Sequence, residues 1–127
     1  MPNVIKDIFW KVVKKYKKRT IQNSDVSLEE FSFNLNNYLK RCELCRVGKV
    51  IIIKIPKPGS NMIYKNEGIF SSIQLYNKLI DSVKFDGELN IIDPLGDAVD
   101  SDYLTDGYHL NRNGFNKVFN NLDLTLK

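Results

Sequence analysis

The stretch with the clearest capacity for chemistry lies near the C-terminus, where Asp106 precedes His109, the chain's one histidine, by three residues. Histidine exchanges protons near neutral pH, and a carboxylate that accepts from one ring nitrogen leaves the other nitrogen to act as a base. Gly107 stands between the two and gives the backbone the freedom to turn the carboxylate back to the ring. We therefore predict that Asp106 accepts a hydrogen bond from a ring nitrogen of His109.

An alternative interpretation is that Asp106 caps the last helix and His109 is an ordinary surface residue. Other polar candidates surround the pair. Asp93-Pro94 follows an apolar run, where a parallel strand would end and a ligand would bind, although Asp before Pro is also a common turn. An acidic loop before the pair would shape a pocket, with Asp97, Asp100 and Asp102. Three residues after the pair would contact substrate or, as we favour, cap the last helix: Asn111, Arg112 and Asn113.

The two cysteines, Cys42 and Cys45, have the C-x-x-C spacing of metal and redox sites. A zinc site needs a second pair of ligands, and a thioredoxin-like site needs a strand before the motif and a helix after it. The sequence offers neither, so we expect no metal and no cofactor.

The basic residues are concentrated at the N-terminus, where residues 1–19 contain seven lysines and arginines and one acidic residue. The apolar residues of this segment are spaced as in an amphipathic helix. Such a helix would contact acidic lipid, nucleic acid or a protein partner, or would be a domain helix with a solvated lysine face. We favour the last reading and expect no nucleic-acid partner, because the rest of the chain is not basic.

Length and composition predict one globular domain over residues 1–127, with 43% hydrophobic and 27% charged residues. No apolar run approaches the roughly 18 residues that a membrane-spanning helix needs, and the N-terminus lacks the pattern of a signal peptide. We therefore expect a cytoplasmic protein without a membrane span.

Helical and strand patterns alternate along the chain. Ser27 and Glu30 form a capping box before a helix that we expect to end between Arg41 and Cys45. The β-branched run over Lys49–Ile55 and the shorter run over Glu88–Ile92 predict two strands that are buried on both faces. Two more helices are expected around residues 69–83 and 115–122, with Phe115, Val118, Phe119 and Leu122 as the inner face of the last one.

This order predicts an α/β fold with parallel strands between layers of helices. Two strands are too few for such a sheet, and an uncovered apolar edge promotes association. We expect the strands to pair either with a missing N-terminal part or with a second copy of the chain.

The chain resembles the C-terminal part of the SGNH, or GDSL-type, hydrolases over residues 24–122. The most specific match is the Asp-x-x-His block from Asp106 to Gly114, supported by the order KVIIIKIPKPG, a helix containing Tyr76-Asn77, and ELNIIDPLG. The resemblance implies a flavodoxin-like α/β/α fold. It also implies a Ser-His-Asp triad in which His109 and Asp106 are catalytic, with a small acyl or acetyl ester, possibly linked to a carbohydrate, as substrate.

Two blocks of that family are absent from the sequence: the Gly-Asp-Ser turn with the nucleophile, and the Gly-x-Asn-Asp block with the oxyanion-hole Asn. Asn23-Ser24-Asp25 has similar residue types, but it follows no apolar strand and lacks the Gly of a sharp nucleophile turn, so we do not expect Ser24 to act. The sequence thus predicts the C-terminal portion of an ester hydrolase that is inactive by itself. The alternative is a non-catalytic α/β module that self-associates or docks through its basic helix.

Overall fold

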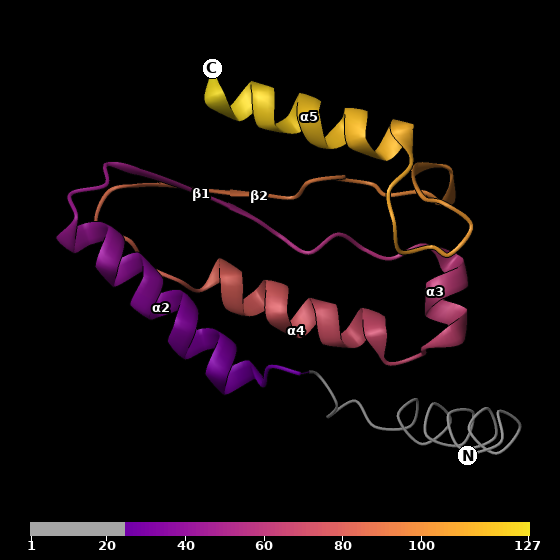
Figure 1. The fold of residues 1–127 in the computed structure, drawn as a ribbon, viewed down its shortest axis with the longest axis horizontal. Coiled ribbons are helices and arrows are strands. Elements are labelled where there is room, and N and C mark those ends of the chain that lie inside the picture. Colours follow the sequence, from indigo (N-terminus) through magenta and orange to yellow (C-terminus); the bar gives the residue numbers. More distant parts are fainter. Residues whose placement is uncertain (1–24) are drawn as a thin grey trace, which may run out of the picture.

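The computed structural model describes residues 25–127, so the expected basic helix over residues 1–19 and Ser24 lie outside the described part of the chain. The elements follow one another in the expected alternation, with a short helix and a 3-10 turn in addition (Figure 1). They are α2 (Leu28–Leu44), β1 (Lys49–Ile53), α3 (Ser60–Lys65), α4 (Ile69–Asp81), β2 (Glu88–Ile92), η1 (Asp100–Asp102) and α5 (Arg112–Leu126).

The two strands are parallel, with Lys49 opposite Glu88 and Ile53 opposite Ile92. The mixed α/β class and the parallel pairing are thereby confirmed. β1 is two residues shorter than the sequence suggested. The strand ends there because the amide and carbonyl of Ile55 bond to the Asn77 side chain, and because Pro56 has no N–H to donate to a ladder.

The capping signal before α2 is read correctly from the sequence. The Ser27 hydroxyl accepts from the Glu30 amide at 3.1 Å, and the helix begins at Leu28. Tyr76 of α4 holds the start of α2 in place. Its ring packs edge to face against Phe31, with 5.2 Å between the ring centroids, and its hydroxyl donates to the Val26 carbonyl. These contacts hold α2 against α4.

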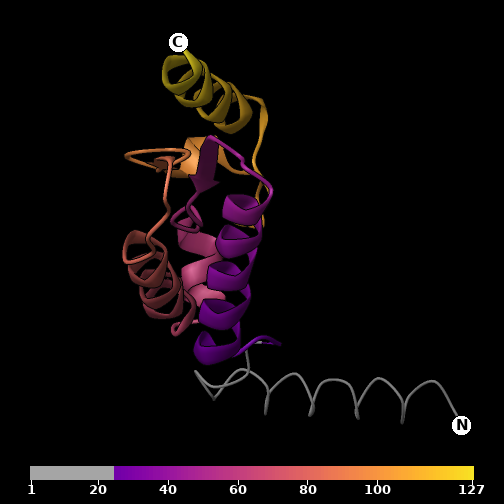
Figure 2. The same cartoon turned by 90° about the vertical axis from the view of Figure 1, so that its left-hand side faces the viewer.

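Helices lie on both sides of the strand pair, with α5 on one side and α2 and α4 on the other (Figures 1 and 2). The core that they enclose is small. Its buried hydrophobic residues within the described part of the chain are Leu39, Val50, Ile80, Ile92, Leu95 and Tyr103. The expected inner face of α5 is partly wrong, because the side chains of Phe115 and Phe119 are 63% and 68% exposed. Much of the apolar surface therefore has no cover among residues 25–127.

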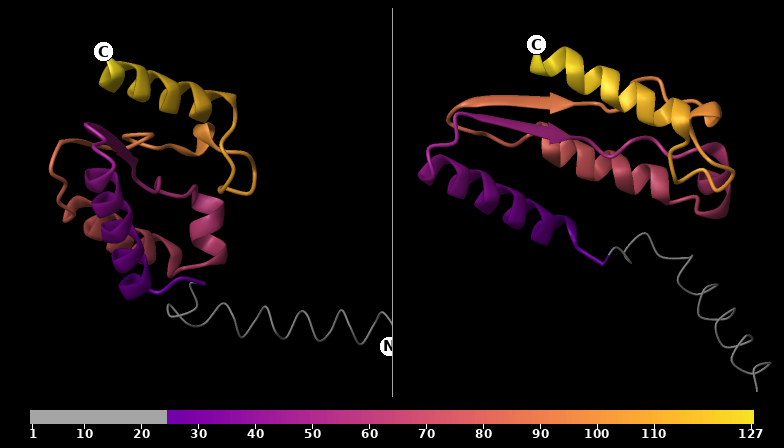
Figure 3. Two further views of the ribbon diagram at one scale, coloured as in Figure 1. Left: turned by 60° about the vertical axis from the view of Figure 1, so that its left-hand side comes forward. Right: turned by 45° about the horizontal axis from the view of Figure 1, so that its top comes forward.

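The strand pair positions the candidate site. Both strands run toward the end of the molecule where α3 and the loop after β2 lie together (Figure 3). None of the helices described over residues 25–127 has the length and apolar character needed to cross a bilayer.

Candidate active site

Asp106 and His109 form the side-chain pair that the sequence predicts. The Asp106 Oδ2 atom lies 2.6 Å from His109 Nδ1. The other carboxylate oxygen, Oδ1, accepts from the backbone amides of Tyr108 at 2.8 Å and His109 at 3.0 Å. The carboxylate is thus fixed by the same short loop that carries the ring, and both of its oxygens are engaged.

This arrangement sets the proton positions at the pair. With Nδ1 donating to the carboxylate, the neutral ring carries its lone pair on Nε2, which is the atom that a general base needs. The hydrogen bond from His109, followed by the two backbone amides, lowers the pKa of Asp106 to about 2. Asp106 is therefore ionised at neutral pH and suited to orient the ring and stabilise its protonated form.

Two glycines place the loop against the start of α3. Gly107 has φ of 69°, and its N–H donates to the Leu104 carbonyl at 2.9 Å. Its carbonyl accepts from Gly59 N at 2.8 Å, and a Cβ on either glycine would come within 3.0 Å of backbone atoms. The close approach of two backbones thus explains both glycines, and it ties the pair to the start of α3.

The loop is closed at its base by a bridge between Tyr103 and Leu110 and by a bond from Leu104 N to the His109 carbonyl at 2.8 Å. Tyr103 is buried, and its hydroxyl donates to the Lys57 carbonyl. Burial, with the nearby charge of Asp102, raises the pKa of Tyr103 to about 12. Tyr103 is accordingly a neutral anchor for the loop.

Asn111, and not Asp106, caps the last helix. Its side-chain oxygen accepts from the amides of Asn113 at 2.9 Å and Gly114 at 3.1 Å. Its side-chain nitrogen donates to the carbonyls of Ser101 and Tyr103. The helix-cap explanation of Asp106 is therefore wrong, and the capping role expected for Asn111 is confirmed.

Three of the acidic candidates, Asp93, Asp100 and Asp102, have structural partners. Asp102 is 1% exposed, and its carboxylate accepts from Lys117 Nζ at 2.7 Å and from Val99 N at 3.1 Å. The Asp100 carboxylate accepts from the Ser60 amide at 2.8 Å. Asp93 accepts from the amides of the next turn, at Leu95 and Gly96, which is the turn role that Asp-Pro suggests.

The region beside the pair offers little enclosed space. A hollow of about 200 Å³ lies between α3 and the loop, where Ser60, Asn61, Tyr103 and Thr105 are among the lining residues. Its two walls are linked by a bond from Asn61 Nδ2 to the Thr105 carbonyl at 2.6 Å. Among residues 25–127, no hydroxyl or thiol forms a hydrogen bond with His109, whose side chain is 68% exposed. The described chain thus presents a base and its orienting carboxylate without a nucleophile.

The cysteines form no site with these groups. Cys42 and Cys45 are both free thiols, and Cys45 is exposed. The described residues contain no group of three or more His, Cys, Asp and Glu side chains that could hold a metal ion.

Sequence reasoning missed the residues that support the loop from other elements. Asn61 of α3 donates to the Thr105 carbonyl within the loop, and Lys117 of α5 donates to the Asp102 carboxylate before it. Their partners are 44 and 15 residues away along the chain, so only the contact of α3 and α5 with the loop reveals them. Lys117 had one available signal, since it lies one turn into a helix that follows an acidic loop.

Comparison with known proteins adds no relative. No protein-family model, no curated protein and no solved structure matches the chain.

Proposed function

We propose that the chain is the C-terminal portion of an SGNH-like ester hydrolase and contributes its base and orienting carboxylate. His109 would take the proton of a serine through Nε2 during attack on the ester carbonyl and return it to the leaving alcohol. Asp106 would hold the ring and stabilise the imidazolium. The serine and the oxyanion donors would come from polypeptide outside residues 25–127.

One observation carries this proposal. The 2.6 Å contact between His109 Nδ1 and Asp106 Oδ2 is made while two backbone amides hold the other carboxylate oxygen. An incidental surface histidine does not need a carboxylate that is fixed on both oxygens. The loop also lies at the carboxyl ends of parallel strands, where the sites of open α/β sheets form.

The proposal extends to the fold and the substrate. The whole enzyme would have a flavodoxin-like three-layer α/β/α fold, whose further strands would cover the apolar side chains that α5 exposes. The substrate would be a small acyl or acetyl ester, possibly on a carbohydrate. A cytoplasmic location is part of the proposal, and the two free thiols support it.

A second candidate function is a non-catalytic module that associates with another polypeptide. The observation in its favour is the small core beside many exposed apolar side chains, among them Leu44 at 80% and Phe119 at 68%. In this case the Asp106–His109 pair would be a half-site without a serine.

The test is hydrolysis of p-nitrophenyl acetate by the protein isolated from its native source, with variants made at the native locus. We expect His109→Ala and Asp106→Asn to lower kcat/KM by at least about 10³-fold, as losses in such triads do. The exposed Asn120→Ala is the matched control and should retain full activity. Activity that survives His109→Ala would reject the proposal, and no activity in any form would favour the non-catalytic module.

A further inference from the structure

The edge of β1 that faces away from β2 is open over three residues. The Lys54 amide donates to the Ile92 carbonyl, and the Gly48 carbonyl accepts from the Glu88 amide. Because backbone groups of alternate residues point to the same side of a strand, the even-numbered residues of β1 bond to β2. Lys49, Ile51 and Ile53 therefore direct their N–H and C=O groups outward, and no strand within residues 25–127 pairs with them.

The open edge has a defined end. The next outward-facing residue is Ile55, whose amide donates to Asn77 Oδ1 at 2.9 Å and whose carbonyl accepts from Asn77 Nδ2 at 2.7 Å. The Asn77 side chain thus bonds to both backbone groups of Ile55, as a neighbouring strand would. Lys49, Ile51 and Ile53 have no such cover, which leaves six backbone groups open to a partner.

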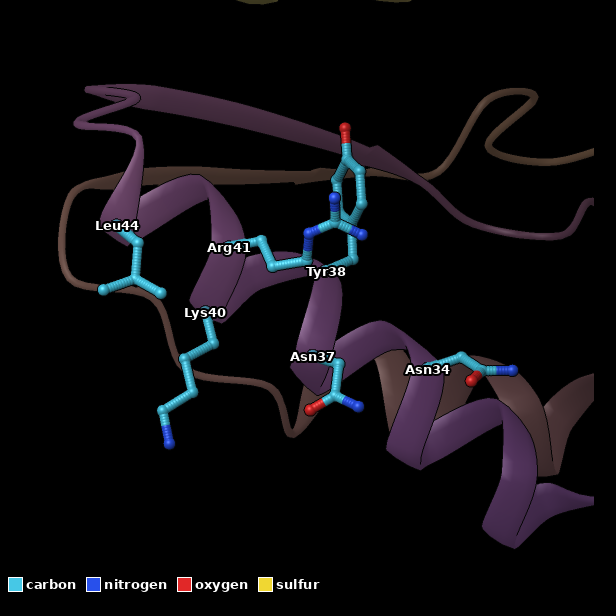
Figure 4. A pocket seen from close by; sticks show the side chains of 6 residues that line it. All are labelled: Asn34, Asn37, Tyr38, Lys40, Arg41 and Leu44. Atoms are coloured by element: carbon cyan, nitrogen blue, oxygen red, sulfur yellow. The ribbon is translucent and has the colours of Figure 1, made fainter.

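A hollow of about 530 Å³ runs between this edge and α2, where Tyr38, Cys42, Val47 and the residues of β1 line it. A second hollow of the same size lies along α2, and Figure 4 shows the six side chains that line it. Tyr38 lines both and is 61% exposed, and Leu44 at the far end is 80% exposed. Together they form a continuous surface, which we call the edge groove, with room for side chains of an added segment.

The charge of the edge groove decides among its possible occupants. Lys40 and Arg41 line it, and neither forms an ion pair with any residue of the described chain. A second copy would present its own β1 run, KVIIIK, whose flanking charges are lysines and not the carboxylates that would complement Lys40 and Arg41. Residues 1–19 of the same chain contain seven basic residues and are unsuitable for the same reason.

We propose that the edge groove binds an extended segment of a partner protein, with apolar residues along β1 and acidic residues against Lys40 and Arg41. Backbone hydrogen bonds to Lys49, Ile51 and Ile53 would supply affinity, and the hollow beside Tyr38 would select the side chains. A complete hydrolase sheet would fill this edge with a further strand of its own, so the inference rests on the second candidate function. None of its residues belongs to the Asp106–His109 loop.

The probe is a fluorescein-labelled peptide, Glu-Glu-Val-Thr-Val-Ile-Val-Asp-Glu, titrated with the full chain and followed by fluorescence anisotropy. We expect saturable binding that Ile51→Pro weakens about tenfold or more, because proline removes one outward amide and leaves the bonds to β2 intact. Arg41→Glu should weaken binding by a similar factor. Lys65→Glu, an equal charge change on α3 at the other end of the strands, should leave it unchanged.

Peptide chemistry keeps the test decisive if Ile51→Pro fails to fold. N-methylation at every second residue in the phase that faces β1 should abolish binding to the wild-type chain, whereas methylation in the other phase should not. Three results would overturn the inference: no binding, equal binding of a peptide in which lysine replaces each acidic residue, or a wild-type dimer in sedimentation that Ile51→Pro converts to monomer. The last result would assign the edge to a second copy.

Discussion

Replacing Gly114 by alanine has two opposing effects on the stability of the fold, a gain in helix propensity and a steric clash. Gly114 lies in the first turn of α5, where alanine is the better helix former by about 1 kcal/mol. However, a Cβ built on Gly114 would lie 2.3 Å from the Asp102 carbonyl oxygen and 3.0 Å from the Leu110 side chain. Since the nearest atom is backbone, α5 and the 3-10 turn have to move apart.

The cost of that movement exceeds the gain in helix propensity. The Asp102 carbonyl accepts from Asn111 N at 2.9 Å, and a net hydrogen bond of this kind contributes about 0.5–1.5 kcal/mol. Overpacking at a closed contact costs about 1–3 kcal/mol in addition. We therefore expect Gly114→Ala to lower the free energy of unfolding by about 0.5–3.5 kcal/mol after the propensity gain is subtracted.

Urea unfolding followed by far-UV circular dichroism measures this change. Gly48→Ala is the matched control, because a Cβ there would meet no atom within 4 Å and stability should change by less than about 1 kcal/mol. A Gly114→Ala protein as stable as wild type, or more stable, would show that the contact between α5 and the 3-10 turn is not tight. It would also remove the structural reason for the glycine that ends the Asp-x-x-His block.

Three further results are expected. The Asp106 carboxyl carbon should titrate near pH 2 by ¹³C NMR and at a clearly higher pH in His109→Ala, though still below the ordinary value of about 3.9, because the amides of residues 108 and 109 keep their bonds to the carboxylate. Because its folded pKa is lowered, its stabilising contribution is complete above about pH 4 and is lost as the pH falls through 2; an unchanged midpoint in the variant would refute the pairing. Lys117→Met should lower the free energy of unfolding in urea by about 1–3 kcal/mol, because it leaves the buried Asp102 carboxylate with only the Val99 amide. The loss stays within this range because the Lys117 side chain is 41% exposed. Adding Asp102→Asn to the same protein should recover part of the loss. The recombinant chain alone should hydrolyse aryl acetates no faster than its denatured form, and turnover that disappears in Ser24→Ala would contradict our reading of Asn23-Ser24-Asp25.

The sequence was most informative where short-range rules act. The Ser27 cap, the β-branched run of β1 and the Asp106–His109 pair depend on residues within a few positions of one another, so spacing alone predicts them. The end of β1 was not predictable in this way, because Asn77 bonds to Ile55 from 22 residues away. α3 was missed as well, since its six residues are too short to show an apolar period.

The error on α5 has a different origin. A hydrophobic period shows which residues share a face, but it does not show whether that face has a partner within the same chain. Phe115 and Phe119 lie one turn apart on α5 and are both exposed. The apolar stripe that the sequence predicts is therefore present, but no part of residues 25–127 covers these two side chains. The same reasoning applies to the strands, whose apolar runs predict burial on both faces. That expectation is wrong within the described chain, where only Val50 of β1 and Ile92 of β2 are buried.

The Asp106–His109 pair is held in a manner that does not require the remainder of a sheet. Its fixed points are the glycine contact at Gly59, the buried Tyr103 and the Asn111 cap, all within the described chain. The loop can therefore keep its geometry while the open edge of β1 and the exposed face of α5 lack their partners. Preservation of the pair is consequently compatible with both proposed functions, and the presence or absence of a nucleophile opposite His109 Nε2 is what separates them. The edge groove lies on the same strand whose carboxyl end leads to Gly59, so a segment added parallel to β1 would run toward this loop and stop where Asn77 bonds to Ile55.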